Sequence, residues 1–76
     1  MTRTEANNKV RDLGFVLSKM HGEFRLSDRI VDLQAKNPKL TIHEITELAE
    51  DRAYYTDDLQ DAVDTARAWR VREEQK

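Results

Sequence analysis

The chain has 76 residues, of which 37% are Asp, Glu, Lys or Arg and 38% are apolar, and its formal net charge at pH 7 is −2. This length suits one domain and leaves no room for a second, and the lack of cysteine excludes disulfides and thiolate metal sites. The sequence has no apolar run near the ~20 residues that a membrane helix needs. The N-terminus also lacks the apolar segment of a signal peptide. We therefore expect a soluble, cytoplasmic protein.

The composition favours an all-α fold. Two Gly and one Pro are too few to turn many short strands, and the dense charge suits helices with solvated outer faces. We predict a compact bundle of three or four short helices over residues 9–21, 27–36, 41–54 and 57–73. They would form a single helical domain of residues 9–76, preceded by a flexible, polar N-terminus of residues 1–8.

The first two predicted helices depend on apolar spacing and on end signals. The apolar residues of the first helix alternate three and four apart: Val10, Leu13, Leu17, Met20 and Phe24. Gly22 is a suitable residue to end this helix in the left-handed conformation. Ser27 is a candidate N-cap for the second helix, and Asn37-Pro38 should stop it, since the residue before Pro avoids the α region.

The third predicted helix opens with a capping box, because Thr41 and Glu44 can each bond the other's backbone amide. Beyond it, a seam of residues again alternates three and four apart: Ile45, Leu48, Arg52, Tyr55, Leu59, Ala62, Ala66 and Trp69. Two interpretations stay open, one continuous helix of about thirty residues or a break near Tyr54-Tyr55-Thr56. We favour the break, because a short chain buries more surface when it folds back on itself.

Catalytic or metal chemistry finds little support in the sequence. His43 and Glu47 have the spacing of two ligands on one helix face, but no third ligand stands at a convincing distance along the chain. The acidic residues lie on the outer face relative to the seam, so nothing separates their pKa values as acid–base catalysis requires. We expect no enzyme, no catalytic or metal-binding residues, no cofactor and no small-molecule substrate.

DNA binding is the alternative function. Residues 1–40 carry eight basic and five acidic side chains, whereas residues 41–76 carry five basic and ten acidic ones. The segment from Arg29 to Ile45, followed by Leu48-Ala49, resembles the first two helices of a helix-turn-helix or winged-helix core. The resemblance covers about a third of the chain and implies a DNA-binding transcriptional regulator.

The resemblance fails after Leu48-Ala49. Such families place a small residue in the turn, where this chain has Glu50-Asp51-Arg52, and the following helix is rich in Asp, which repels phosphate. DNA contacts would therefore come from the basic first half: Lys9, Arg11, Lys19, Arg25 and Arg29.

Protein binding is the leading hypothesis. Arg67, Arg70 and Arg72 surround Trp69, and Arg and Trp are both enriched in interface hot spots. We predict a small helical adaptor, inhibitor or regulator that binds a protein partner, foremost a second copy of itself in a homodimer. The predicted contact residues lie along the seam and beside it: Arg52, Tyr55, Leu59, Ala66, Trp69 and Arg70.

Overall fold

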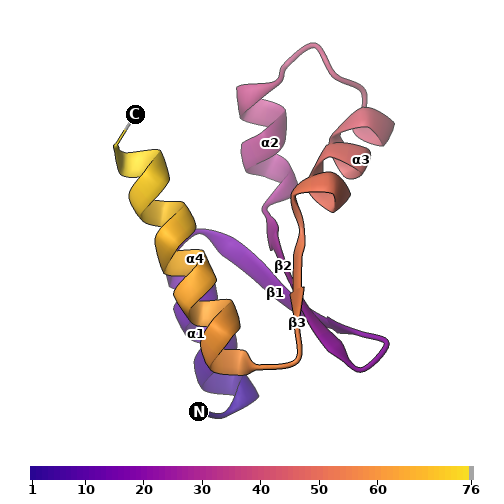
Figure 1. Ribbon diagram of the computed structural model, residues 1–76. Coiled ribbons are helices and arrows are strands. Elements are labelled where there is room, and N and C mark those ends of the chain that lie inside the picture. The colour runs from indigo at the N-terminus through magenta and orange to yellow at the C-terminus, as the bar shows by residue number, and fades with distance from the viewer. Residues whose placement is uncertain (76) are drawn as a thin grey trace.

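The computed structural model describes residues 1–75, which form an α+β fold with four helices and one three-stranded antiparallel sheet (Figure 1). The elements in chain order are α1 (Arg3–Asp12), β1 (Phe15–Met20), β2 (Glu23–Asp28), α2 (Ile30–Lys36), α3 (Ile42–Arg52), β3 (Tyr54–Thr56) and α4 (Leu59–Glu74). Strand β2 is central and pairs with β1 on one side and β3 on the other. The predicted all-α helical bundle is therefore wrong.

Strand β1 replaces most of the helix predicted over residues 9–21, of which only residues 9–12 are helical, at the end of α1. Helix α1 begins at Arg3, inside the segment predicted to be flexible, and Thr2 caps it by accepting a hydrogen bond from the Glu5 amide. It ends at Asp12, because Gly14 takes a left-handed conformation with φ of 95° and donates its amide to the Arg11 carbonyl. The chain then leaves the helix as a strand.

A tight hairpin joins β1 to β2. His21 and Gly22 form its two-residue loop, both with positive φ (51° and 83°), which matches the right-handed twist of the flanking strands. The predicted role of Gly22 as a helix end is thus wrong, although its left-handed conformation is confirmed. Ser27, the predicted N-cap, is a buried residue of β2, and α2 starts at Ile30 without a side-chain cap.

Several predictions for the chain from α2 onward are confirmed. Thr41 and Glu44 form the capping box of α3. The Glu44 amide donates to Thr41 Oγ1 at 3.2 Å, and the Thr41 amide donates to Glu44 Oε1 at 3.1 Å. Helix α2 ends at Lys36, just before Asn37-Pro38. The break between the last two helices is present, and the segment Tyr54–Thr56 fills it as strand β3. Asp58 caps α4 by accepting from the Gln60 amide at 2.9 Å.

Helices α1 and α4 lie side by side on one face of the sheet (Figure 1). Strand partners share a face, so Phe15, Leu26 and their neighbours point toward these helices, while Val16, Met20 and Tyr55 point away. The main core contains Ala6, Val10, Phe15, Leu26, Val63 and Ala66. The described residues extend over 39 × 31 × 16 Å, as expected for one sheet covered on one face.

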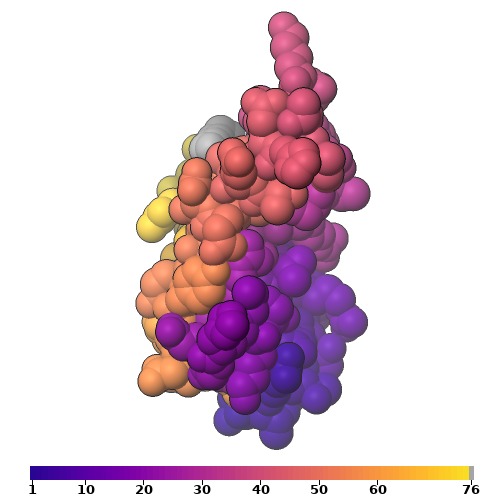
Figure 2. Space-filling view, turned by 90° about the vertical axis from the view of Figure 1, so that its right-hand side faces the viewer, coloured from indigo at the N-terminus to yellow at the C-terminus, as the bar shows by residue number. Residues whose placement is uncertain are grey.

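Helices α2 and α3 form an arm at the end of the sheet opposite the hairpin loop. The arm has its own small core of Leu33, Ile45 and Ala49, with Leu48 packed against it. Figure 2 shows this arm at one end of an elongated molecule and α1 at the other. The two cores share no residue, so the arm can hold a position beside α4 without being packed onto it.

Substitution of Gly22 tests the hairpin. An added Cβ would meet no atom within 4 Å, so Gly22→Ala acts through the backbone alone. We expect it to lower the free energy of unfolding by about 1 kcal/mol, because L-residues are strained in the left-handed region. Urea denaturation measures the change. His21→Asn serves as the control and should retain or slightly raise stability, since Asn tolerates this conformation; equal stability of Gly22→Ala and wild type would contradict the turn.

Candidate functional site

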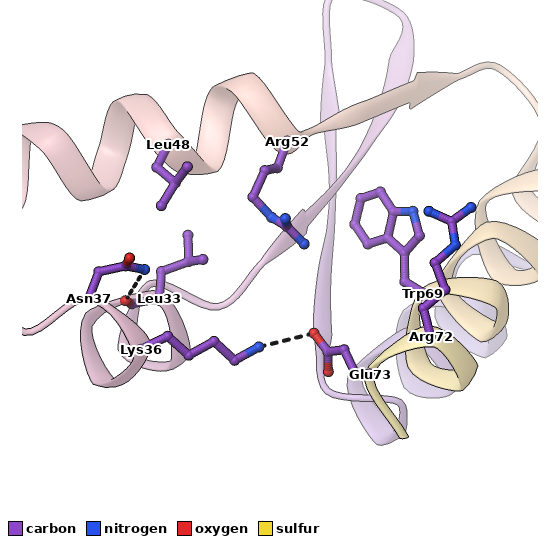
Figure 3. A pocket seen from close by; sticks show the side chains of 8 residues that line it. All are labelled: Leu33, Lys36, Asn37, Leu48, Arg52, Trp69, Arg72 and Glu73. Atoms are coloured by element: carbon purple, nitrogen blue, oxygen red, sulfur yellow. Dashed lines mark hydrogen bonds and ion pairs between the residues drawn. The ribbon is translucent and has the colours of Figure 1, made fainter. Parts of the chain in front are cut away.

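A groove of about 650 Å³ separates the α2–α3 arm from the C-terminal half of α4. Its lining residues come from both sides: Leu33, Lys36, Asn37, Leu48, Arg52, Trp69, Arg72 and Glu73. In Figure 3 the two leucines face Trp69 and Arg72 across the opening, and the Arg52 side chain extends between them. Its walls thus belong to two different cores, with Leu33 and Leu48 from the arm and Trp69 from the main core.

An ion pair holds Arg52, one of the residues that line this groove, to the sheet. The Arg52 Nε donates to Asp28 Oδ2 at 2.6 Å, and the Asp28 side chain is only 5% exposed while that of Arg52 is 48% exposed. Hydrogen bonding to Asp28 raises the pKa of Arg52 above its usual value. A buried carboxylate is costly without a partner, so this contact ties the last residue of α3 to the last residue of β2.

A second ion pair crosses the groove. Lys36 Nζ at the end of α2 lies 3.2 Å from Glu73 Oε1 on α4 (Figure 3). A smaller hollow of about 280 Å³ shares Leu33, Lys36 and Glu73 with the groove and continues toward Gly14 and Arg70. Because Lys36 is largely exposed, this contact is weak and can be broken by a ligand at small free-energy cost.

Trp69 joins the groove to the main core. Its ring meets that of Phe15 edge to face, with centroids 5.4 Å apart and an interplanar angle of 79°. The residue is half-buried, so part of the indole lines the groove while the rest packs on the core. A rigid aromatic wall of this kind is a common anchor for a bound side chain.

The predicted contact residues do not form one surface. Arg52 and Trp69 meet in the groove, whereas Arg70 lines the smaller hollow and bonds Glu74. Tyr55 lies on the uncovered face of the sheet, and Leu59 packs against the main core. Ala66 has no exposed surface, so it cannot contact a partner. The predicted seam is divided because its spacing requires one continuous helix, whereas strand β3 separates α3 from α4.

The basic residues predicted for DNA binding are also dispersed. Lys9 and Arg11 lie on α1, and Lys19 lies on β1 over the Phe24 ring. Arg25 bonds Glu50 and Ser27, and Arg29 donates to the Arg11 carbonyl at 2.8 Å. The helix pair of the predicted helix-turn-helix segment exists as α2 and α3. The exposed residues of α3, however, include Glu44, Glu47, Glu50 and Asp51.

Sequence reasoning missed most of the groove. Leu33, Lys36, Asn37 and Glu73 come together only through the tertiary position of the arm, and no local pattern marks them. Arg72 was within reach, because it lies three residues after Trp69 and so shares its helix face. Leu48 lay on the predicted seam four residues before Arg52, but it was not among the predicted contact residues.

Outside the groove, Glu50 collects polar contacts on the open face of the sheet. It accepts a hydrogen bond from Tyr55 Oη and pairs with Arg25 at 2.9 Å. The Tyr55 bond and the Arg25 charge lower the pKa of Glu50, and the same bond raises the pKa of Tyr55. Both shifts lead away from neutral pH, the opposite of what an acid–base catalyst needs.

Among residues 1–75, no three His, Asp or Glu side chains converge as metal ligands would. No helix in this range has the length and apolar character needed to span a membrane. No protein-family model, curated protein or solved structure matches the chain.

Removal of Arg52 tests its ion pair with Asp28. Arg52→Ala leaves Asp28 buried without its partner, and we expect a loss of roughly 1–3 kcal/mol in the free energy of unfolding. Because Arg52 is half-exposed, water can replace part of the lost contact with Asp28, and the loss in the free energy of unfolding can then be as small as about 1 kcal/mol. Arg67→Ala is the matched control: its partner Asp64 is exposed, so urea denaturation should show a change within about 0.5 kcal/mol. Equal losses in the two variants would contradict the assigned role of Arg52.

The Tyr55–Glu50 contact predicts a pH dependence. In a Tyr54→Phe background only Tyr55 contributes phenolate absorbance, and its pKa should lie above that of free tyrosine and fall toward it in Glu50→Gln. The raised pKa of Tyr55 contributes to stability at pH values below the pKa of this group in the unfolded chain. That contribution is lost as the pH rises through its pKa in the folded protein. The lowered pKa of Glu50 contributes to stability at pH values above the pKa of this group in the unfolded chain. That contribution is lost as the pH falls through its pKa in the folded protein. An unshifted Tyr55 titration would contradict the contact.

Proposed function

We propose that the protein is a small, non-enzymatic interaction module that binds a segment of another protein in the groove between the α2–α3 arm and α4. The observation that supports this function is the groove itself, in which apolar side chains from two separate cores, Leu33 and Leu48 on one side and Trp69 on the other, stand among polar ones. A side chain inserted between Leu48 and Trp69 would contact both cores at once and remove apolar surface from water. The volume of the groove, about 650 Å³, falls in the range of pockets that bind ligands.

The distribution of perturbed groups also favours binding over catalysis. Glu50, Arg52, Tyr54 and Tyr55 have shifted pKa values, and hydrogen bonds to a neighbouring side chain are the first cause in each case. Each shift moves the group further from titration near pH 7. These residues therefore act as structural contacts in this proposal.

Peptide selection tests the proposed site. A random twelve-residue display library should yield peptides that bind the protein and shift the NMR signals of Trp69, Leu33 and Leu48. We expect Leu48→Glu to weaken these peptides at least tenfold, because it places a charge in the apolar wall. Leu40→Glu, which changes an exposed leucine of the α2–α3 connection, is the matched control and should change affinity less than twofold.

The NMR shifts keep this test valid if Leu48→Glu fails to fold. Peptides that shift signals of the open sheet face instead, or a library that yields no specific binder, would contradict the groove as the binding site.

Self-association is a second form of protein binding that one surface favours. Val16 and Met20 are each 43% exposed on the open face of the sheet, and β1 is an edge strand. Antiparallel pairing of two β1 strands about Ser18 would place Val16 of one copy opposite Met20 of the other. This arrangement would extend the sheet across a two-fold axis.

Charge substitutions test this dimer. Sedimentation equilibrium should show a dimer for the wild type and a monomer for the double variant V16E/M20E, which sets like charges opposite each other. The variant V16E/M20K carries the same number of changes but restores opposite charges across the strands, so it should dimerise again. A wild type that stays monomeric at millimolar concentration would exclude this mode of association.

A further inference from the structure

The charge of the groove differs from that of the whole molecule. Three cationic side chains line it, Lys36, Arg52 and Arg72, whereas two carboxylates are in contact with them, Glu73 with Lys36 and Asp28 with Arg52. The complete chain carries a net charge of −2. A local excess of positive charge beside apolar walls selects a ligand with negative charge next to an apolar group.

Arg72 is the cation most available to a ligand. Among the described residues it forms no ion pair, whereas Arg67 pairs with Asp64 at 3.5 Å and Arg70 with Glu74 at 3.2 Å. Its guanidinium lies beside the Trp69 indole at the edge of the groove (Figure 3). A planar guanidinium in this place can bind a carboxylate through two parallel hydrogen bonds.

Arg52 offers a second, pre-organised contact. Its Nε bonds Asp28, and this is the one hydrogen bond of its side chain among the residues described. The terminal amines of the half-exposed guanidinium can therefore donate to a ligand in the groove. Because Asp28 already holds the side chain in place, binding loses less side-chain entropy than at a mobile arginine.

From this arrangement we infer that the groove binds an acidic, amphipathic peptide segment. An apolar side chain of the segment lies between Leu48 and Trp69, and neighbouring carboxylates bind Arg72 and Arg52. A nucleic-acid backbone fits less well, since it would also have to approach the exposed residues of α3, the helix that supplies Leu48 and Arg52, and these include several carboxylates. This inference depends on the proposed function and adds the chemical class of the partner.

The peptides selected from the display library also test this inference. Those that bind the groove should carry Asp or Glu within two positions of a large apolar residue, and their affinity should fall at least tenfold between 50 and 500 mM NaCl. Replacing their acids with Asn or Gln should weaken binding to the wild type at least tenfold. The same replacement should weaken binding to Arg72→Gln by a clearly smaller factor, because the charge of Arg72 is already gone and only that of Arg52 remains to be lost. Arg67→Gln, on the same helix but outside the groove, is the control and should behave like the wild type.

The outcomes separate the inference from the function on which it depends. Groove-binding peptides that are neutral or basic, or that tolerate loss of their acids, would overturn the acidic partner and leave the interaction module standing. Displacement of the peptides by a nonspecific 20-base-pair DNA duplex would overturn it in favour of a polyanion. The absence of any groove-binding peptide would overturn both.

Discussion

The contact between Arg52 and Asp28 determines how the two parts of this small protein are joined. Each residue is the last of its element, α3 and β2 respectively, so the pair fixes both the direction in which α2 leaves the sheet and the point where β3 returns to it. The buried carboxylate makes the contact difficult to give up, because an unpaired charge in that position is strongly unfavourable. We therefore expect the placement of the arm, and with it the width of the groove, to depend on this ion pair.

A chain of this size would be expected to place its apolar residues in one core, since small domains have little hydrophobic stabilisation to spare. Here the residues are divided between a main core under α1 and α4 and a smaller one inside the arm. Ion pairs that link the arm to the rest of the molecule include Arg52–Asp28, Arg25–Glu50 and Lys36–Glu73. The proposed function depends on the apolar surface that remains accessible in the groove between the two cores.

The features that could be predicted from the sequence are those with a local cause. The capping box at Thr41, the stop at Asn37-Pro38 and the break at Tyr54–Thr56 each depend on a few adjacent residues, and the structure contains all three. The hairpin was missed because the spacing of Leu17, Met20 and Phe24 fits a helix as well as two strands. The signal that separates them is the period-two spacing of Phe15 and Leu17 in one strand and of Phe24 and Leu26 in the next, with Gly22 in a two-residue loop between them.

The site was predictable in smaller part, for the same reason. Arg52 and Trp69 were identified from side-chain type and seam spacing, and both line the groove. Ala66 was a poor choice, because small residues on a helix seam mark close packing as readily as contact with a partner. Leu33 and Lys36 face α4 only because the arm turns toward it, and that turn depends on a pair of residues 24 positions apart in the chain.

A distance measurement across the groove tests the central claim most directly. The chain has no cysteine, so spin labels can be attached to cysteines placed at Glu47 of α3 and Ala68 of α4, both exposed. Pulsed electron–electron double resonance should give one narrow distance distribution for the otherwise wild-type protein. In the Arg52→Ala background it should become broader and longer, whereas Arg67→Ala should leave it unchanged. An unaltered distribution in Arg52→Ala would show that packing, and not the ion pair with Asp28, holds the arm in place.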